Sequence, residues 1–157
     1  MLNWAASNKL SLASNSLNTR NITKNTKTKE IIYKELSYKI VGLLFSLIKT
    51  LGGDYQEKYY QRGFEKLIYK EAIPFDRELF VKVEIDGEQI GKHFVDFVID
   101  KRIVLEFKKG SFPRIGDIKQ VLMYLKTLNL KLGILAYFSS NGVKIKRIIN
   151  KDFREIL

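Results

Sequence analysis

The sequence predicts an α/β protein of the α+β type, in which helices flank a mixed central sheet. Two patterns predict this class. Apolar residues recur at helical spacing in three segments, and five other segments have the alternation or the apolar run of a strand. In chain order the elements read ααβββαββ, and a length of 157 residues suits one domain of this kind.

Two helices are predicted in the first half of this domain. The first begins at Glu35, carries apolar residues at helical spacing, and ends at Gly52 and Gly53. The second spans residues 55–72 and stops before a proline. Glu57 lies on the apolar stripe of this second helix, where a carboxylate is costly unless it is paired or bound to metal. Alternatively, the edge of the stripe is solvated and Glu57 is an ordinary surface residue.

Three strands are expected next. Residues 79–85 alternate as a strand, and Asp86-Gly87 is a strong signal for a two-residue hairpin turn. The return strand begins at Glu88 or Gln89 and ends at residue 99. A tight turn at residues 100–102 then leads into a strand over residues 103–108.

The last third of the chain completes the sheet. Helical spacing resumes over residues 114–128. Two further strands, residues 132–138 and 143–149, are joined by a Ser-Ser-Asn-Gly turn. We therefore expect a helix between the third and fourth strands and a hairpin at the end.

Composition narrows the chemistry available to the chain. Lys and Arg number 28 and Asp and Glu 17, so the net charge of +11 favours a polyanionic partner, nucleic acid before an anionic membrane. The absence of cysteine excludes disulfides, zinc–thiolate sites and iron–sulfur clusters. With His93 as the only histidine, a multi-histidine metal site is excluded. Catalysis would rest on carboxylates, Lys, Tyr or a hard metal ion.

The N-terminal segment differs from the rest of the chain. Residues 1–29 contain fourteen Asn, Ser or Thr, five Lys or Arg and no acid, and this composition predicts a flexible basic tail before a domain at residues 30–157. We find neither a membrane-spanning segment, which needs about 20 apolar residues, nor a secretory signal. We therefore expect a cytoplasmic protein.

Three charged side chains are predicted to converge in the middle hairpin. If residues 100–102 form a three-residue loop, Ile99 pairs with Ile103 and Asp96 falls directly opposite Glu106 on the same face. Opposite residues have Cβ atoms about 4.5–5.5 Å apart, so the two carboxylates would repel unless a cation lies between them. A two-residue loop would send Asp96 to the other face.

These residue types suit a hard metal ion. Asp96 and Glu106 offer oxygen ligands that fit Mg²⁺ or Mn²⁺, and the main-chain carbonyl of Phe107 could add another. Lys108 shares the face of Glu106 and could orient a water or stabilise developing phosphate charge. The alternative is a cross-strand salt-bridge cluster on a solvated face. His93, three residues before Asp96, is expected on the opposite face in regular strand geometry.

The residues quoted above resemble a known family. Asp96 followed by Glu106-Phe107-Lys108 resembles the D…(D/E)-x-K signature of the PD-(D/E)XK nuclease superfamily. Residues 54–60 are similar to the name-giving motif of its GxxExxY proteins, with Glu57 and Tyr60 matching and Asp54 in place of the motif's glycine. The resemblance implies a restriction-endonuclease-like αβββαβ core.

The resemblance also implies site residues. Asp96 and Glu106 would bind Mg²⁺ or Mn²⁺, Lys108 would assist the attacking water, and Glu57 would complete the site as a metal or water ligand. Gln120 and Tyr124 resemble the Gln-xxx-Tyr motif of the RecB-like branch, which helps to hold DNA. The alternative is that Tyr124 is a core or interface aromatic residue and Gln120 a surface residue. The predicted nucleic-acid contacts are Gln120, Tyr124, Tyr60, Lys109, Arg114 and Lys119.

Two nucleic-acid functions remain open at this point, and a third, an anionic-membrane or protein-interaction domain that uses the basic surface, has no clear amphipathic basic helix to support it. The first is a Mg²⁺-dependent nuclease that hydrolyses phosphodiester bonds, with DNA as the expected partner. The second is a nucleic-acid-binding module that keeps the fold with little or no hydrolysis. The complete set of Asp96, Glu106 and Lys108 favours the first, because a binding module has no need for two close carboxylates. The oligomeric state stays open, although a homodimer would allow both strands to be cut.

Overall fold

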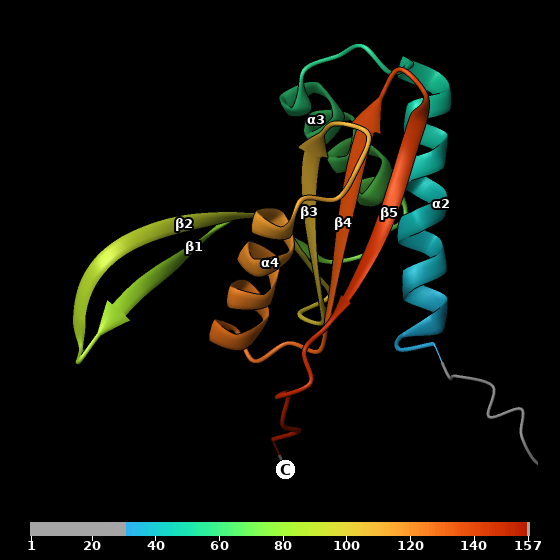
Figure 1. The fold of residues 1–157 in the computed structure, drawn as a ribbon. Coiled ribbons are helices and arrows are strands. Elements are labelled where there is room, and N and C mark those ends of the chain that lie inside the picture. The colour runs from blue at the N-terminus through green and yellow to red at the C-terminus, as the bar shows by residue number, and fades with distance from the viewer. Residues whose placement is uncertain (1–30, 157) are drawn as a thin grey trace, which may run out of the picture. The chain divides into compact units, whose positions relative to one another are not determined.

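The order of elements confirms the predicted fold class. The computed structural model describes residues 31–156, so the tail predicted at residues 1–29 lies outside the described residues. The elements, which Figure 1 shows, are α2 (Lys34–Leu51), α3 (Glu57–Lys70), β1 (Phe75–Ile85), β2 (Glu88–Ile99), β3 (Ile103–Lys109), α4 (Ile115–Thr127), β4 (Leu132–Ser139) and β5 (Gly142–Ile149). None of the helices in this part of the chain is both long and apolar enough to cross a membrane.

The five strands form one sheet in the order β1-β2-β3-β4-β5. All neighbouring pairs are antiparallel except β3 and β4, which are parallel. A parallel pair needs a crossover, and α4 supplies it. Helices α2 and α3 lie on one face of the sheet and α4 lies on the other, as Figure 1 shows.

Each face of the sheet has its own apolar core. The core under α2 and α3 is rich in aromatic residues, and Phe107 stacks on Phe138 with ring centroids 5.4 Å apart. The core under α4 contains Val98, Val104 and Leu135. Side chains of β3 therefore alternate between two buried layers, which explains why the strand is almost continuously apolar.

Strand β1 changes face in its middle, and this is why its start was predicted too late. Phe75 contacts Phe97 in the core under α2 and α3, whereas Leu79 packs in the core under α4. Phe75 and Leu79 are four positions apart, so in a regular strand their side chains would lie on the same face of the sheet. Glu78 lies between them with φ of 52°, a left-handed conformation that rotates the following side chains to the other face.

Strand β2 makes the same change opposite Glu78. Phe97 lies in the core under α2 and α3, but Val95 packs under α4. The ring of His93 consequently lies 5.9 Å from that of Tyr124 on α4. The prediction that His93 faces away from the charged cluster is wrong, because it assumed unbroken alternation between residues 93 and 96.

The connection between α2 and α3 is held by a close contact with the last hairpin. A side chain at Gly53 would clash with the carbonyl oxygen of Ser139, so only glycine fits here. Gly52 ends α2 with a φ of 82°, and its backbone N–H donates a hydrogen bond to the carbonyl oxygen of Ile48. These two glycines turn the chain so that α3 begins beside the C-terminal end of β3, with Glu57 as its first residue.

Candidate active site

The hairpin between β2 and β3 has the predicted three-residue loop. Ile99 pairs with Ile103, and the register continues through Val98 with Val104 and Phe97 with Leu105. Asp100 and Lys101 adopt left-handed backbone conformations in the turn. The next position along this register sets Asp96 opposite Glu106, as the sequence predicted.

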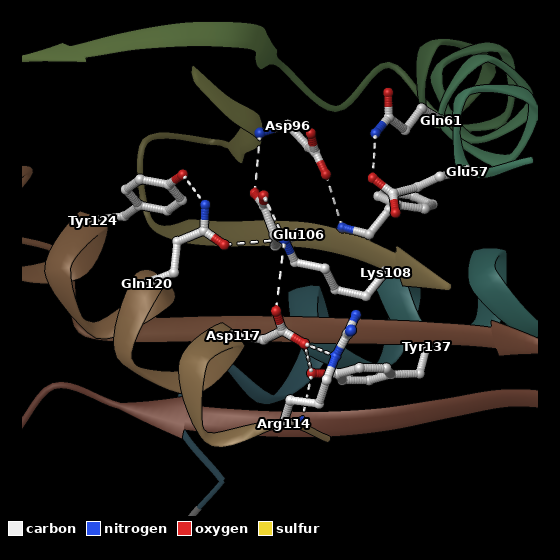
Figure 2. A network of polar contacts seen from close by, with 11 residues as sticks. Glu57, Gln61, Asp96, Glu106, Lys108, Arg114, Asp117, Gln120, Tyr124 and Tyr137 are labelled. Atoms are coloured by element: carbon white, nitrogen blue, oxygen red, sulfur yellow. Dashed lines mark hydrogen bonds and ion pairs between the residues drawn. The ribbon is translucent and has the colours of Figure 1, made fainter. Parts of the chain in front are cut away.

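Beyond the last paired residues of β2 and β3, the two carboxylates accept the backbone hydrogen bonds that link the strands. The backbone N–H of Asp96 donates to Glu106 Oε2 at 3.2 Å, and the backbone N–H of Phe107 donates to Asp96 Oδ2 at 2.8 Å. Figure 2 shows the two side chains meeting between the strands. Each acid is therefore held by the other strand's backbone, which fixes both orientations without any metal.

Burial makes this pair of acids electrostatically unfavourable. Glu106 is only 4% exposed, and burial, together with the charge of Asp96, raises its pKa to about 8. Burial also raises the pKa of Asp96, although the N–H of Phe107 and the charge of Lys108 oppose the change. A buried acid and a partly buried one that repel each other are the arrangement that a bound cation would stabilise.

Lys108 is held beside this pair by three acceptors. Its Nζ donates to Gln120 Oε1 at 3.0 Å and lies 3.8 Å from both Glu106 Oε1 and Asp117 Oδ1. The side chain is 18% exposed, so its ammonium group is largely removed from water. The amine that was predicted to accompany the two carboxylates is thus confined next to Glu106.

Gln120 and Tyr124 support Lys108 from helix α4. Gln120 Nε2 donates to the hydroxyl of Tyr124 at 2.7 Å, which leaves Oε1 of the same amide for Lys108. Tyr124 is completely buried, and burial with the nearby charge of Glu106 raises its pKa to about 12. The prediction that Tyr124 contacts nucleic acid is therefore wrong for the side chain as placed, because it has no exposed surface. It orients Gln120 instead.

Asp117 joins this network and was not singled out from the sequence. The hydroxyl of Tyr137 donates to Asp117 Oδ2 at 2.7 Å, and Arg114 Nε donates to the same oxygen at 3.2 Å. Asp117 thereby completes the set of acceptors around Lys108 (Figure 2). Its position three residues before Gln120, on the same helix face, is the signal that could have identified it.

Glu57 reaches the cluster from the beginning of α3, as Figure 2 shows. Burial raises its pKa and the charge of Asp96 raises it further, while Lys108 and the backbone N–H of Lys109 lower it. Gln61 Nε2 donates weakly to Glu57 Oε1 at 3.4 Å. The carboxylate on the apolar stripe of this helix therefore lies within electrostatic reach of the two central acids.

Tyr60 has a structural position rather than the predicted one at a nucleic-acid surface. It is completely buried, and its ring stacks on Phe138 with centroids 4.1 Å apart. Its hydroxyl donates to the carbonyl of Gly52 at 2.5 Å and accepts from the N–H of Tyr55 at 3.3 Å. Tyr60 thus braces the turn that begins α3, and the prediction of a direct nucleic-acid contact is wrong.

The remaining predicted contacts are exposed. Lys109, Arg114 and Lys119 all have solvent-exposed side chains around the end of β3 and the start of α4. Arg114 also pairs with Asp117, and its backbone N–H donates to the hydroxyl of Tyr137 at 3.2 Å. Their role toward nucleic acid stays a prediction.

The donor set fits a hard divalent ion with an incomplete protein shell. In the described part of the chain, no group of three or more His, Asp or Glu side chains is close enough to hold a metal by itself. Asp96 and Glu106 nevertheless converge, and Mg²⁺ commonly uses one or two carboxylates and keeps several waters. The close approach of these two acids, of which Glu106 is buried, is the observation that fits a cation here.

Comparison with known proteins places the chain in a family. A family model described as the PD-(D/E)XK nuclease superfamily matches residues 34–148. The chain belongs to the PD-(D/E)XK nuclease superfamily. The matched range includes Asp96, Glu106 and Lys108, the three residues that resemble the superfamily signature.

A solved structure supports the fold of this superfamily member. The chain is similar to the crystal structure of SSO0001, with 22% identity and a TM-score of 0.50 over 59% of this chain and 48% of that one. The chain thus spans about half the length of that protein. Comparison with curated proteins gives no significant match.

Proposed function

We propose that this member of the superfamily is a divalent-metal-dependent nuclease that hydrolyses phosphodiester bonds in DNA. One observation carries the proposal: Asp96 and Glu106 are held face to face by each other's strand, with Lys108 Nζ 3.8 Å from Glu106. A binding module would gain nothing from keeping two acids that repel each other close together and partly or fully removed from water. The net charge of +11 supports a polyanionic substrate.

The residues that would hold Mg²⁺ or Mn²⁺ are Asp96 and Glu106, with the main-chain carbonyl of Phe107 and the carboxylate of Glu57 as additional oxygen ligands. When bound, the ion would polarise the phosphate and lower the pKa of a water, as divalent ions do in hydrolytic sites. Glu57 would act directly or through a water.

In this proposal Lys108 acts on the attacking water and on the phosphate. Its ammonium group, fixed by Gln120 and Asp117, can orient the attacking water and balance the negative charge that develops on the phosphate. The attacking water gives up one proton to the solvent as its oxygen forms the new bond to phosphorus. The bond from phosphorus to the leaving sugar oxygen breaks, and that oxygen takes up a proton from the solvent. Gln120, Asp117 and Tyr124 are positioning residues, since they act through Lys108.

We also infer that the chain falls among the GxxExxY proteins of the superfamily. Two motif residues have separate structural tasks that support this assignment. Glu57 extends toward the two central acids, and Tyr60 braces the turn that sets the start of α3. Asp54 in place of the motif's glycine is the one departure, and Gly53 meets the need for a small residue one position earlier.

The proposal is tested with purified protein on linear, supercoiled and branched DNA in Mg²⁺, Mn²⁺ or EDTA. The variants Asp96→Asn, Glu106→Gln and Lys108→Met remove one active group each with little change in volume. Glu88→Gln, at an exposed position at the start of β2, is the matched control. We expect cleavage that needs metal, is lost in the three site variants and persists in the control.

Other outcomes would change the assignment. Cleavage that persists in all three site variants would come from a contaminating nuclease and would refute the proposal. Tight, salt-sensitive binding without cleavage would support the nucleic-acid-binding module instead. Measuring the mass of the active species in solution would show whether a homodimer performs the reaction.

A further inference from the structure

A groove lies between α3 and β1, on the other side of β1 and β2 from Lys108 and α4. It has a volume of about 640 Å³, and its lining includes Arg62, Lys66, Tyr69 and Lys70 from α3 and Arg77 from β1. Tyr69 is 77% exposed and presents its ring to the solvent. We call this the α3–β1 groove. Its residues belong to none of the contacts predicted from the sequence.

The helix wall of the groove carries a row of like charges. Lys58, Arg62, Lys66 and Lys70 follow one another at every fourth position, so they lie along one side of α3. Each step advances about 6 Å along the helix axis. Neighbouring like charges at this spacing repel each other and destabilise a helix, so the row opposes the stability of α3.

The nearby acids do not neutralise this row. Glu65 also lines the groove, but its carboxylate pairs with Arg77. Glu71 pairs with Lys39 on α2 at 2.5 Å. Within the described residues, the side chains of Arg62, Lys66 and Lys70 form no ion pair. The groove therefore presents three exposed cations that a polyanion could bind.

The groove leads to the candidate active site at two points. The row on α3 begins at Lys58, directly after Glu57. On the opposite wall, Arg77 of β1 lies opposite Phe97 of β2, the residue after Asp96. The Nε of Arg77 is buried and has no hydrogen-bond partner among the described residues.

We propose that the α3–β1 groove binds the sugar–phosphate backbone of the substrate strand beyond the cleavage site. The identity of the ligand rests on the proposed function, but binding in the groove does not need cleavage. Cations spaced along α3 would contact successive phosphates, and the exposed ring of Tyr69 offers a face on which an unpaired base can stack. The groove thereby extends the binding surface away from the metal ligands.

The test compares two variants that lose the same charge. Arg62→Ala/Lys66→Ala/Lys70→Ala removes the three cations of the row that line the groove, and Arg154→Ala/Lys151→Ala/Lys34→Ala removes one Arg and two Lys from exposed positions outside the groove. Fluorescence anisotropy of labelled duplex and single-stranded DNA is measured in EDTA at several salt concentrations. Because both variants have equal net charge, a difference between them reports local contacts rather than long-range attraction.

The logarithm of the DNA association constant falls linearly with the logarithm of the salt concentration. We expect the groove variant to make this slope less steep by about 2–3, or by about one for each lost phosphate contact. The control variant should keep a slope close to that of the wild type. Equal slopes in the two variants, or no DNA binding by the wild type, would overturn the inference. If the triple variant melts at a lower temperature than the control, Lys66→Gln alone is compared with Lys151→Gln, and a slope change of about one is expected.

These results separate the inference from the proposed function. Binding that depends on the groove, without cleavage by the wild type, would leave the groove assignment standing and defeat the nuclease. Cleavage by the wild type, with equal slopes in both variants, would defeat only the groove.

Discussion

Replacing Glu106 by Gln should stabilise the metal-free protein at high pH. In the folded protein the pKa of Glu106 is raised from 4.5 to about 8, chiefly by burial and then by the charge of Asp96. A folded-state pKa above the unfolded value means that the folded state holds the proton more tightly. Stability should then fall as the pH rises from about 4.5 to about 8, with the full penalty present above that range.

The size of the effect follows from the same two pKa values. They differ by about 3.5, and each pKa unit corresponds to about 1.4 kcal/mol, so ionised Glu106 destabilises the fold by up to about 5 kcal/mol. The amide in Glu106→Gln still accepts from the N–H of Asp96, but its NH₂ group faces Lys108 and costs about 1–3 kcal/mol. The net gain at about pH 9 should be about 2–4 kcal/mol, or roughly 10 °C in Tm.

Thermal melts in EDTA at about pH 5 and about pH 9 measure this difference. The wild type and the exposed control Glu88→Gln should lose stability between the two values, whereas Glu106→Gln should change much less. Added Mg²⁺ should stabilise the wild type more than Glu106→Gln at the higher pH, because the ion binds only the folded site. Parallel pH dependence in the wild type and Glu106→Gln would refute the argument that this carboxylate is held at an electrostatic cost.

Three further substitutions probe the network around the amine. Lys108→Met should lower kcat for DNA cleavage by about 10²–10⁴ with little change in KM, and steady-state kinetics that show the reverse would contradict its assigned role. Asp117→Asn removes a negative charge 3.8 Å from Lys108 Nζ, so it should lower kcat roughly tenfold and shift the pH–rate profile. The DNA affinity in EDTA should be kept, and an unchanged pH–rate profile would show that Asp117 is only structural. Tyr124→Phe should cost about 1 kcal/mol in chemical unfolding and slow cleavage, because Gln120 loses its anchor, and a large loss of DNA affinity would restore the direct contact that burial argues against.

Much of the site could be predicted from short stretches of sequence. The Asp86-Gly87 turn joins β1 to β2, and the three-residue loop after Ile99 sets the pairing of β2 with β3, so that Asp96 falls opposite Glu106. Lys108 follows because residues two apart on a strand share a face. These are local relations, determined by turn length and alternation, and the structure has them as predicted.

Relations between distant residues were predicted less well. Asp117 and Tyr137 lie 20 positions apart and meet only because α4 crosses over the parallel pair of β3 and β4. Glu78 and the change of face that it introduces moved His93 to the side of α4. Helix spacing relates Asp117 to Gln120, but no local pattern shows that Asp117 meets Tyr137 or that the strand changes face at Glu78.

The burial of Tyr60 and Tyr124 shows where prediction from local sequence ends and the tertiary fold decides. Sequence places each tyrosine on the correct helix, one turn from a polar partner, but an aromatic ring at such a position can face solvent, ligand or core. That choice depends on which surface packs against the helix, and the packing is a property of the assembled sheet. Local propensity and turn geometry therefore bring the two acids and the amine together, whereas only the tertiary fold determines which side chains surround and support them.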